Sequence, residues 1–185
     1  MTMNAHPHRP HPPRRTAAGF TLLEVLIAIV VVAFGLLGLA GLQVFALKNN
    51  QSASLRVAAA NLTTDIIDRM KANYIGVINN DYNRPLTSSY TSVEATCATT
   101  GCAPAALARN DLREWQQRVA ASLPGGIGIV CLDKNPNDAS LPTASDCDGD
   151  GATGYAVKIW WYDDRTQANK VNPGTRKYMY TAFNP

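Results

Sequence analysis

A single carboxylate, Glu24, lies near the start of a strongly apolar stretch of the chain. The segment from Val25 to Leu42 is an unbroken run of 18 apolar residues. A carboxylate surrounded by lipid costs on the order of 3 kcal/mol, so it needs a positively charged partner. Glu24 therefore suggests ion pairing inside a membrane or an apolar helix bundle. The simpler interpretation is a membrane anchor whose acid reaches the membrane surface.

A second group of carboxylates has the spacing of the first half of an EF-hand calcium loop, and it consists of Asp146, Asp148 and Asp150. The second half of the loop is missing, because Val157 occupies the position of the bidentate glutamate and lies in a predicted strand. We therefore favour a polar hairpin turn, and a calcium site at these three aspartates is the minority hypothesis.

The chain has four cysteines, Cys97, Cys102, Cys131 and Cys147. An even number of cysteines is typical of disulfides in an oxidising compartment. We favour the pairs Cys97–Cys102 and Cys131–Cys147, because each joins the nearest neighbours in sequence. The other two connectivities remain open at this stage, and the spacing does not support a zinc site.

The three histidines of the chain, His6, His8 and His11, all lie within the first 19 residues. A protein that begins at Phe20 therefore has no histidine, which excludes Ser-His and Cys-His nucleophile pairs and histidine-ligated zinc. The aromatic and acidic stretch 160–165 is interpreted as a strand with a charged end. We expect no enzymatic activity and no cofactor.

The residues beyond Leu47 continue the apolar pattern in an amphipathic form. Apolar side chains recur at steps of three and four residues, which predicts one buried helical stripe. Its members are Leu55, Ala59, Leu62, Ile66 and Met70. No proline interrupts residues 20–73, so we expect one long helix whose second half is covered by a globular partner.

The remainder of the chain predicts a small mixed domain. Residues 73–108 have loop composition, and Asp111 with Glu114 three positions later resembles the capped start of a second helix. Three β-branched and aromatic segments predict strands, at 127–132, 155–162 and 176–183. The expected fold class is α+β, with a long amino-terminal helix packed on a small antiparallel sheet.

Charge is distributed unevenly along the chain, which has 17 basic and 14 acidic residues. Three arginines and no acid lie in the first 19 residues, so basic and acidic side chains balance at 14 each from Phe20 onward. This balance gives no general attraction to nucleic acid. Arginines directly before the apolar run place the amino terminus in the cytoplasm. A Sec-type signal peptide is the alternative, although its apolar region is usually only about 7 to 15 residues long.

The basic segment 14–18 and the junction Gly19-Phe20-Thr21-Leu22-Leu23-Glu24 together resemble the class III signal of type IV prepilins. The resemblance implies that a prepilin peptidase cuts after Gly19 and methylates the new amino terminus at Phe20. It also implies that Glu24, the fifth residue of the processed chain, meets the amino terminus of a neighbouring subunit.

The resemblance divides the chain into three parts. Residues 1–19 are a basic leader, 20–47 form the transmembrane half of the long helix, and 48–185 form an exported domain that includes its amphipathic half. The implied location is the inner membrane, with one span, a cytoplasmic amino terminus and a periplasmic domain, followed by the pilus at the cell surface.

Four further features, taken together, resemble the minor-pilin family called type IV pilus modification protein PilV. They are the Asp111-Leu-x-x-Trp115 helix, the turn 123–126, the strand that contains Val130-Cys131 and the stretch 160–165. The implied partners are other minor pilins, the major pilin and the prepilin peptidase, in a complex that starts pilus assembly or caps the tip. The alternatives are a minor pseudopilin of type II secretion and a tip adhesin or DNA-uptake pilin.

Overall fold

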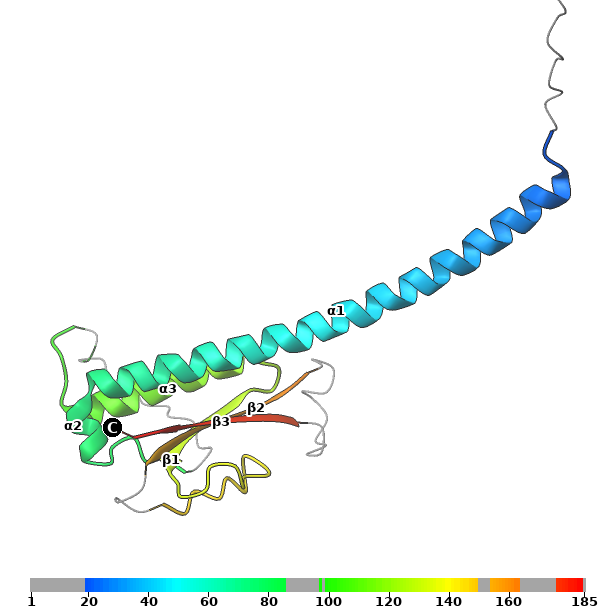
Figure 1. Ribbon diagram of the computed structural model, residues 1–185. Coiled ribbons are helices and arrows are strands. Elements are labelled where there is room, and N and C mark those ends of the chain that lie inside the picture. The colour runs from blue at the N-terminus through cyan, green and yellow to red at the C-terminus, as the bar shows by residue number, and fades with distance from the viewer. Residues whose placement is uncertain (1–18, 86–96, 98, 150–153, 164–175, 185) are drawn as a thin grey trace, which may run out of the picture. The chain divides into compact units, whose positions relative to one another are not determined.

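The computed structural model describes residues 19–85, 97, 99–149, 154–163 and 176–184. Three helices and three strands lie within these residues (Figure 1). In chain order they are α1 (Leu22–Ala72), α2 (Tyr74–Ile78), α3 (Pro104–Ser122), β1 (Ile127–Leu132), β2 (Tyr155–Tyr162) and β3 (Arg176–Phe183). The α+β class is confirmed, and the three strands have the predicted bounds.

The chain divides into two compact units, Met1–Ala46 and Leu47–Pro185, and α1 contributes to both. In the first unit, the described residues form the amino-terminal part of α1, and all of them are exposed. This part is apolar on every face, as expected of a helix that lies in lipid or in a helix bundle.

In the second unit, the remaining turns of α1 bury one stripe against the rest of the domain. All five apolar positions predicted from their spacing are buried: Leu55, Ala59, Leu62, Ile66 and Met70. They share a hydrophobic core with Leu112, Trp115 and Val119 of α3 and with residues of all three strands. The amphipathic second half of the long helix is therefore confirmed.

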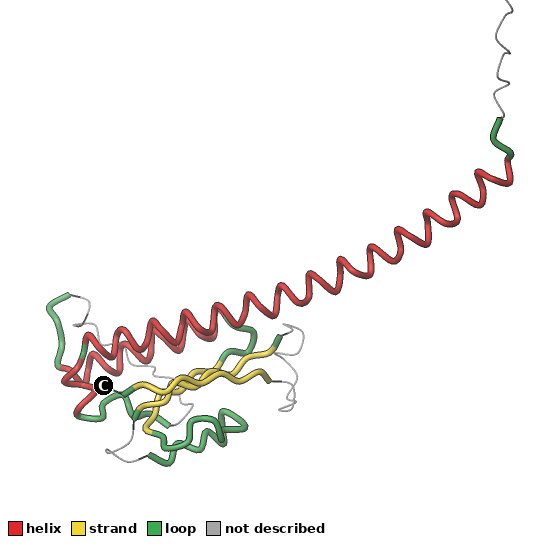
Figure 2. The backbone as a smooth tube through the Cα atoms, in the orientation of Figure 1, coloured by secondary structure: helices red, strands yellow, loops and turns green. Residues whose placement is uncertain are grey.

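The sheet is antiparallel and has the order β1-β2-β3. Val157 of β2 lies opposite Val130 of β1 on one side and Thr181 of β3 on the other. Figure 2 shows α1 and α3 on one side of the sheet and the loop 133–149 on the other. The sheet of this unit is therefore covered on both faces.

Alternation along β2 places Trp160 and Trp161 on opposite faces, as predicted. Trp161 belongs to the core beneath the helices. Trp160 packs in a second core with Ile129, Cys131 and Ala139. Trp160 is buried as completely as Trp161 because loop 133–149 covers the face of the sheet that would otherwise meet solvent.

The prediction of a loop over 73–108 is wrong at both ends. Asn73 accepts a hydrogen bond from the Gly76 backbone at 3.4 Å and begins the short helix α2. Helix α3 begins at Pro104 rather than at Asp111, because proline is favoured in the first turn, where its missing N–H costs no helical hydrogen bond. The side chain of Asp111 is instead buried in the middle of α3.

Candidate functional site

The predicted cleavage junction lies at the start of α1. Gly19 and Phe20 are exposed, and the Phe20 side chain is 82% accessible. The helix begins at Leu22, and the Thr21 hydroxyl accepts a hydrogen bond from the Glu24 backbone N–H at 3.3 Å. Thr21 is thus the helix cap, and the T-x-x-E spacing is that of a capping box. Sequence analysis missed this signal, although it is visible in the residues.

Glu24 lies in the first turn of α1 and is exposed. Its carboxylate is favoured there by the partial positive charge of the helix amino terminus. It is the only charged side chain between Phe20 and Leu47. Glu24 lies one helical turn from Phe20. Its carboxylate can therefore contact a positively charged group that approaches the amino-terminal end of α1.

The apolar part of α1 carries large exposed side chains on all its faces, from Leu22 through Leu47. This helix is long and apolar enough to cross a membrane, as judged by length and composition. Such a surface is stable in lipid or against similar helices, and it is a liability in water. The arrangement can therefore anchor the chain and bundle it with other helices.

Ion pairs hold α3 on the second half of α1. Arg69 contacts Asp111 at 3.1 Å and Glu114 at 2.9 Å, both on α3. In the same interface, Arg118 of α3 donates two hydrogen bonds to the Asp65 carboxylate. The hydrogen bond from Arg69 holds the pKa of Glu114 below its ordinary value. These charges join two helices that are distant in sequence.

A buried polar junction continues this contact at the end of α1. The Tyr82 hydroxyl donates to Asp111 at 2.7 Å, and the Asn73 amide donates to the Tyr82 oxygen at 3.1 Å. Burial, reinforced by the hydrogen bond to Asp111, raises the pKa of Tyr82. The Trp115 indole N–H donates to the Leu62 carbonyl at 2.8 Å. The junction aligns α1, α3 and the chain after α2.

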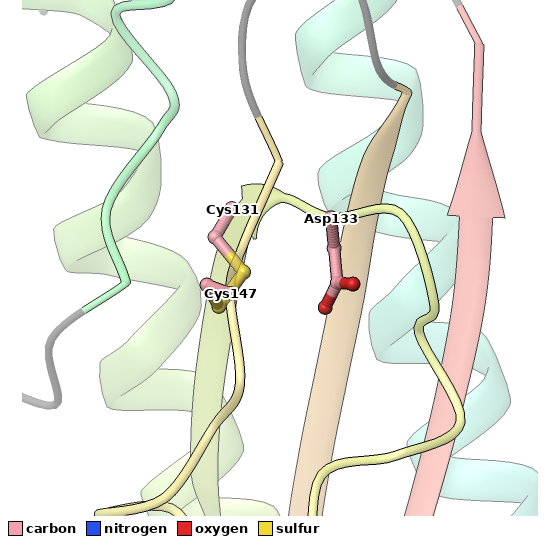
Figure 3. Close-up of side chains that lie close together, drawn as sticks. All are labelled: Cys131, Asp133 and Cys147. Atoms are coloured by element: carbon pink, nitrogen blue, oxygen red, sulfur yellow. A yellow bond between two sulfur atoms is a disulfide. The ribbon is translucent and has the colours of Figure 1, made fainter.

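The structure pairs Cys97 with Cys102 and Cys131 with Cys147, as favoured from the sequence. Cys131, Cys147 and Asp133 lie close together (Figure 3). Both sulfurs are consumed by the disulfide, and the Asp133 carboxylate pairs with the Lys158 ammonium. This group is therefore a structural crosslink and not a set of free metal ligands.

The Asp133–Lys158 pair is enclosed between β2 and loop 133–149, and both side chains are 0% exposed. Lys158 also donates to the Ser145 carbonyl at 2.5 Å, and Asp133 accepts from the Asn135 backbone at 2.8 Å. The pair ties the loop to the outer face of the sheet. Sequence analysis did not identify it, because a lysine that alternates with apolar strand residues ordinarily faces solvent.

The remaining predicted polar residues have separate roles. Asp148 accepts a hydrogen bond from the Lys134 backbone at 3.2 Å, Asp146 adopts a positive φ of 43°, and Asp150 lies outside the described residues. Calcium binding at these aspartates stays the minority hypothesis, beside the favoured polar turn. Asp163 accepts a hydrogen bond from Ser52 at 3.2 Å, while residues 164 and 165 also lie outside the described part.

Two family models match adjoining parts of the chain. Residues 14–40 match the prokaryotic N-terminal methylation motif, and residues 41–113 match the model described as type IV pilin Tt1218. A search of curated proteins and a search of solved structures found no match. Pilins are structural proteins without enzymatic activity, which agrees with the absence of a catalytic prediction. The chain thus carries a match to the N-terminal methylation motif, and a segment similar to type IV pilin Tt1218 follows it directly.

Proposed function

We propose that this protein is a minor pilin of the type IV pilus, of the PilV type, which joins other minor pilins in the complex that primes pilus assembly or caps the tip. One observation carries the proposal. An uncovered apolar helix with a single first-turn carboxylate directly follows the Gly19–Phe20 junction and leads into a folded α+β domain. The match to the methylation motif supports the same conclusion.

The proposed assembly chemistry begins with removal of the leader. A prepilin peptidase hydrolyses the Gly19–Phe20 bond at the cytoplasmic side of the inner membrane and methylates the new amino group. The methylated amine stays positively charged near neutral pH. When two such helices pack together, the Glu24 carboxylate of one chain forms an ion pair with the methylated amino terminus of the neighbouring chain. The pairing offsets the cost of burying each charge in an apolar bundle.

The exported domain supplies the surface by which the subunit meets the other minor pilins and the major pilin. Ion pairs between α1 and α3, the buried polar junction and two disulfides support a domain that keeps its shape outside the cell. Balanced charge in the processed chain gives no reason to expect nucleic acid as a partner.

Glu24→Gln tests the pairing role separately from the capping role. Glutamine serves as well as glutamate at the third position of a capping box, but it carries no charge. We expect this variant to insert into membranes normally and to lose its partner minor pilins when detergent extracts are affinity purified. Thr21→Val is the matched control, because it removes the cap and leaves the charge. Normal partner recovery by Glu24→Gln would contradict the proposal.

Gly19→Trp tests the processing step. A bulky side chain before the scissile bond should block cleavage, so the protein should keep its leader and a higher mass in membrane fractions. The measurement is the intact mass of the purified protein. A processed chain of normal mass in this variant would contradict cleavage after Gly19.

A further inference from the structure

Four cations lie at the end of the second unit where α1 enters it. Lys48 and Arg56 are exposed on α1, while Arg176 and Lys177 begin β3. Asp163 is the one carboxylate among the described residues at this end, and it pairs with Lys177 at 3.5 Å. The described part of this end therefore carries a net positive charge, unlike the balanced processed chain as a whole.

A small cavity of about 210 Å³ opens between α1 and the sheet at this end. It is lined by two cations, Arg56 and Lys177, and by Trp161, Tyr178 and Met179. The Trp161 and Met179 side chains face the helices, whereas the Tyr178 ring stacks on Trp160 on the other face of the sheet. No ion-pair partner of Arg56 occurs in the part of the chain that the structure describes. An aromatic and apolar wall beside exposed cations suits a ligand that has an anionic head and an apolar body.

Neighbouring cations are held in place by local contacts. The Arg176 guanidinium donates to the Gly125 carbonyl at 3.1 Å and lies 4.5 Å from the centre of the Tyr162 ring. Arg176 therefore holds its positive charge at the start of β3, on the face of the sheet opposite to Lys177. This adds to the potential that an anion meets there.

Two of these cations, Lys48 and Arg56, lie on α1 shortly after its apolar segment. The expected transmembrane half of α1 ends at Leu47, and at 28 residues it is longer than the roughly 20 helical residues that a hydrocarbon core about 30 Å thick requires. Lys48 then lies at the edge of the core, and the Arg56 backbone lies about 14 Å beyond Leu47. Helical side chains point back toward the amino terminus, and long cationic side chains extend to headgroups.

We infer that this cationic end, defined by Lys48, Arg56, Arg176 and Lys177, binds the headgroup of an anionic phospholipid while the subunit waits in the membrane. The inference rests on the membrane-anchored state in the proposed function. The phosphate pairs with Arg56 and Lys177, and the glycerol and first methylenes contact the apolar wall of the cavity. The subunit is thereby held with this end against the bilayer before it enters a pilus.

Native mass spectrometry of the full-length protein in a neutral detergent tests this inference, with phosphatidylglycerol and phosphatidylcholine titrated separately. The wild type should retain phosphatidylglycerol more tightly than phosphatidylcholine, and added salt should reduce the difference. Each cation near an anionic lipid contributes roughly a fivefold gain in affinity, so Arg56→Gln with Lys177→Gln should weaken phosphatidylglycerol binding by about 25-fold.

Lys71→Gln is the matched control, because Lys71 is an exposed cation at the far end of α1. It should bind both lipids as the wild type does, and Arg56→Lys should retain most of the affinity. Equal binding of the two lipids, an unchanged double variant or an equal loss in Lys71→Gln would each overturn the inference. A dimer that forms without lipid and is lost in the double variant would also overturn the inference. The cavity would then be occupied by a second copy of the protein and not by a lipid.

The two proposals can fail separately. Lipid titration does not depend on cleavage at Gly19 or on pilus entry, so an unprocessed protein still gives a clear lipid result. An overturned lipid result leaves the partner recovery of Glu24→Gln unaffected.

Discussion

Removing one member of the buried Asp133–Lys158 pair should destabilise the exported domain strongly. Both side chains are 0% exposed, and within the described part of the chain the Lys158 ammonium also donates to the Ser145 carbonyl. Asp133→Asn leaves this ammonium buried without its countercharge. Breaking one side of a buried ion pair typically costs about 3 to 5 kcal/mol, and we expect a cost in this range.

Removing both charges should be far less damaging. The double variant Asp133→Asn with Lys158→Met leaves no buried charge and fills the space of the lysine stem with a flexible apolar side chain. We expect it to lie within about 1.5 kcal/mol of the wild type. The coupling energy between the two positions should then be at least about 4 kcal/mol.

Urea unfolding of the full-length protein in detergent, followed by tryptophan fluorescence, measures these costs. All three tryptophans, Trp115, Trp160 and Trp161, are buried in the second unit, so their emission reports the unfolding of that unit. Asp138→Asn is the control, because it removes an exposed carboxylate from the same loop and should change stability by less than about 0.5 kcal/mol.

Two results would refute this reasoning. One is a cost below about 1 kcal/mol for Asp133→Asn, which would mean that the ammonium finds another partner or water. The other is a double variant whose cost equals the sum of the single costs, which would mean that the two side chains do not interact.

Three further changes probe other contacts. Cys131→Ser should lower the free energy of unfolding by about 2 to 4 kcal/mol, and an unchanged thermal midpoint under non-reducing conditions would contradict this. Gly128→Ala places a methyl group 2.5 Å from the Trp115 ring and should cost about 1 to 3 kcal/mol in urea unfolding; wild-type stability would show that the ring shifts freely. Arg69 lowers the folded-state pKa of Glu114, so the stability from this contact is present above the ordinary carboxyl pKa and is lost as pH falls through the lowered one. The unfolding midpoints of Glu114→Gln and the wild type should therefore converge as the pH falls. A difference between the two midpoints that stays constant with pH would contradict this.

The elements that could be predicted from sequence are those whose burial follows a simple period. The stripe from Leu55 to Met70 repeats every three or four residues, and all its members are buried. Strand β2 is apolar and aromatic at most positions and is buried at all of them. Such patterns depend on the local geometry of one element, so they can be recognised without knowing its neighbours.

The elements that could not be predicted depend on tertiary contacts. Asp111 has the sequence context of a helix cap, yet its carboxylate is bonded to Arg69 and Tyr82 from distant parts of the chain. Lys158 alternates with apolar residues as a solvent-facing strand residue would, but loop 133–149 covers it. The sequence of that loop has no periodic apolar pattern from which its packing on the sheet could be predicted.

The candidate assembly residues were visible in the sequence because their signal is local. Gly19, Phe20 and Glu24 lie within six positions, in a motif confined to the start of a single helix. The cationic end of the exported domain is different, since α1 and β3 contribute to it from positions more than 100 residues apart. Only the folded chain brings Arg56 and Lys177 to one cavity.

Mass spectrometry of the amino-terminal peptide, from sheared surface filaments and from the inner-membrane fraction, is the most direct test of the proposed pilin function. The account predicts a peptide that begins at N-methylated Phe20 in both fractions, since the subunit is processed in the membrane and then enters the pilus. The same peptide in membranes alone would contradict incorporation into the pilus. An amino terminus that is intact, or cut at another position, would contradict the processing step and the pilin function with it.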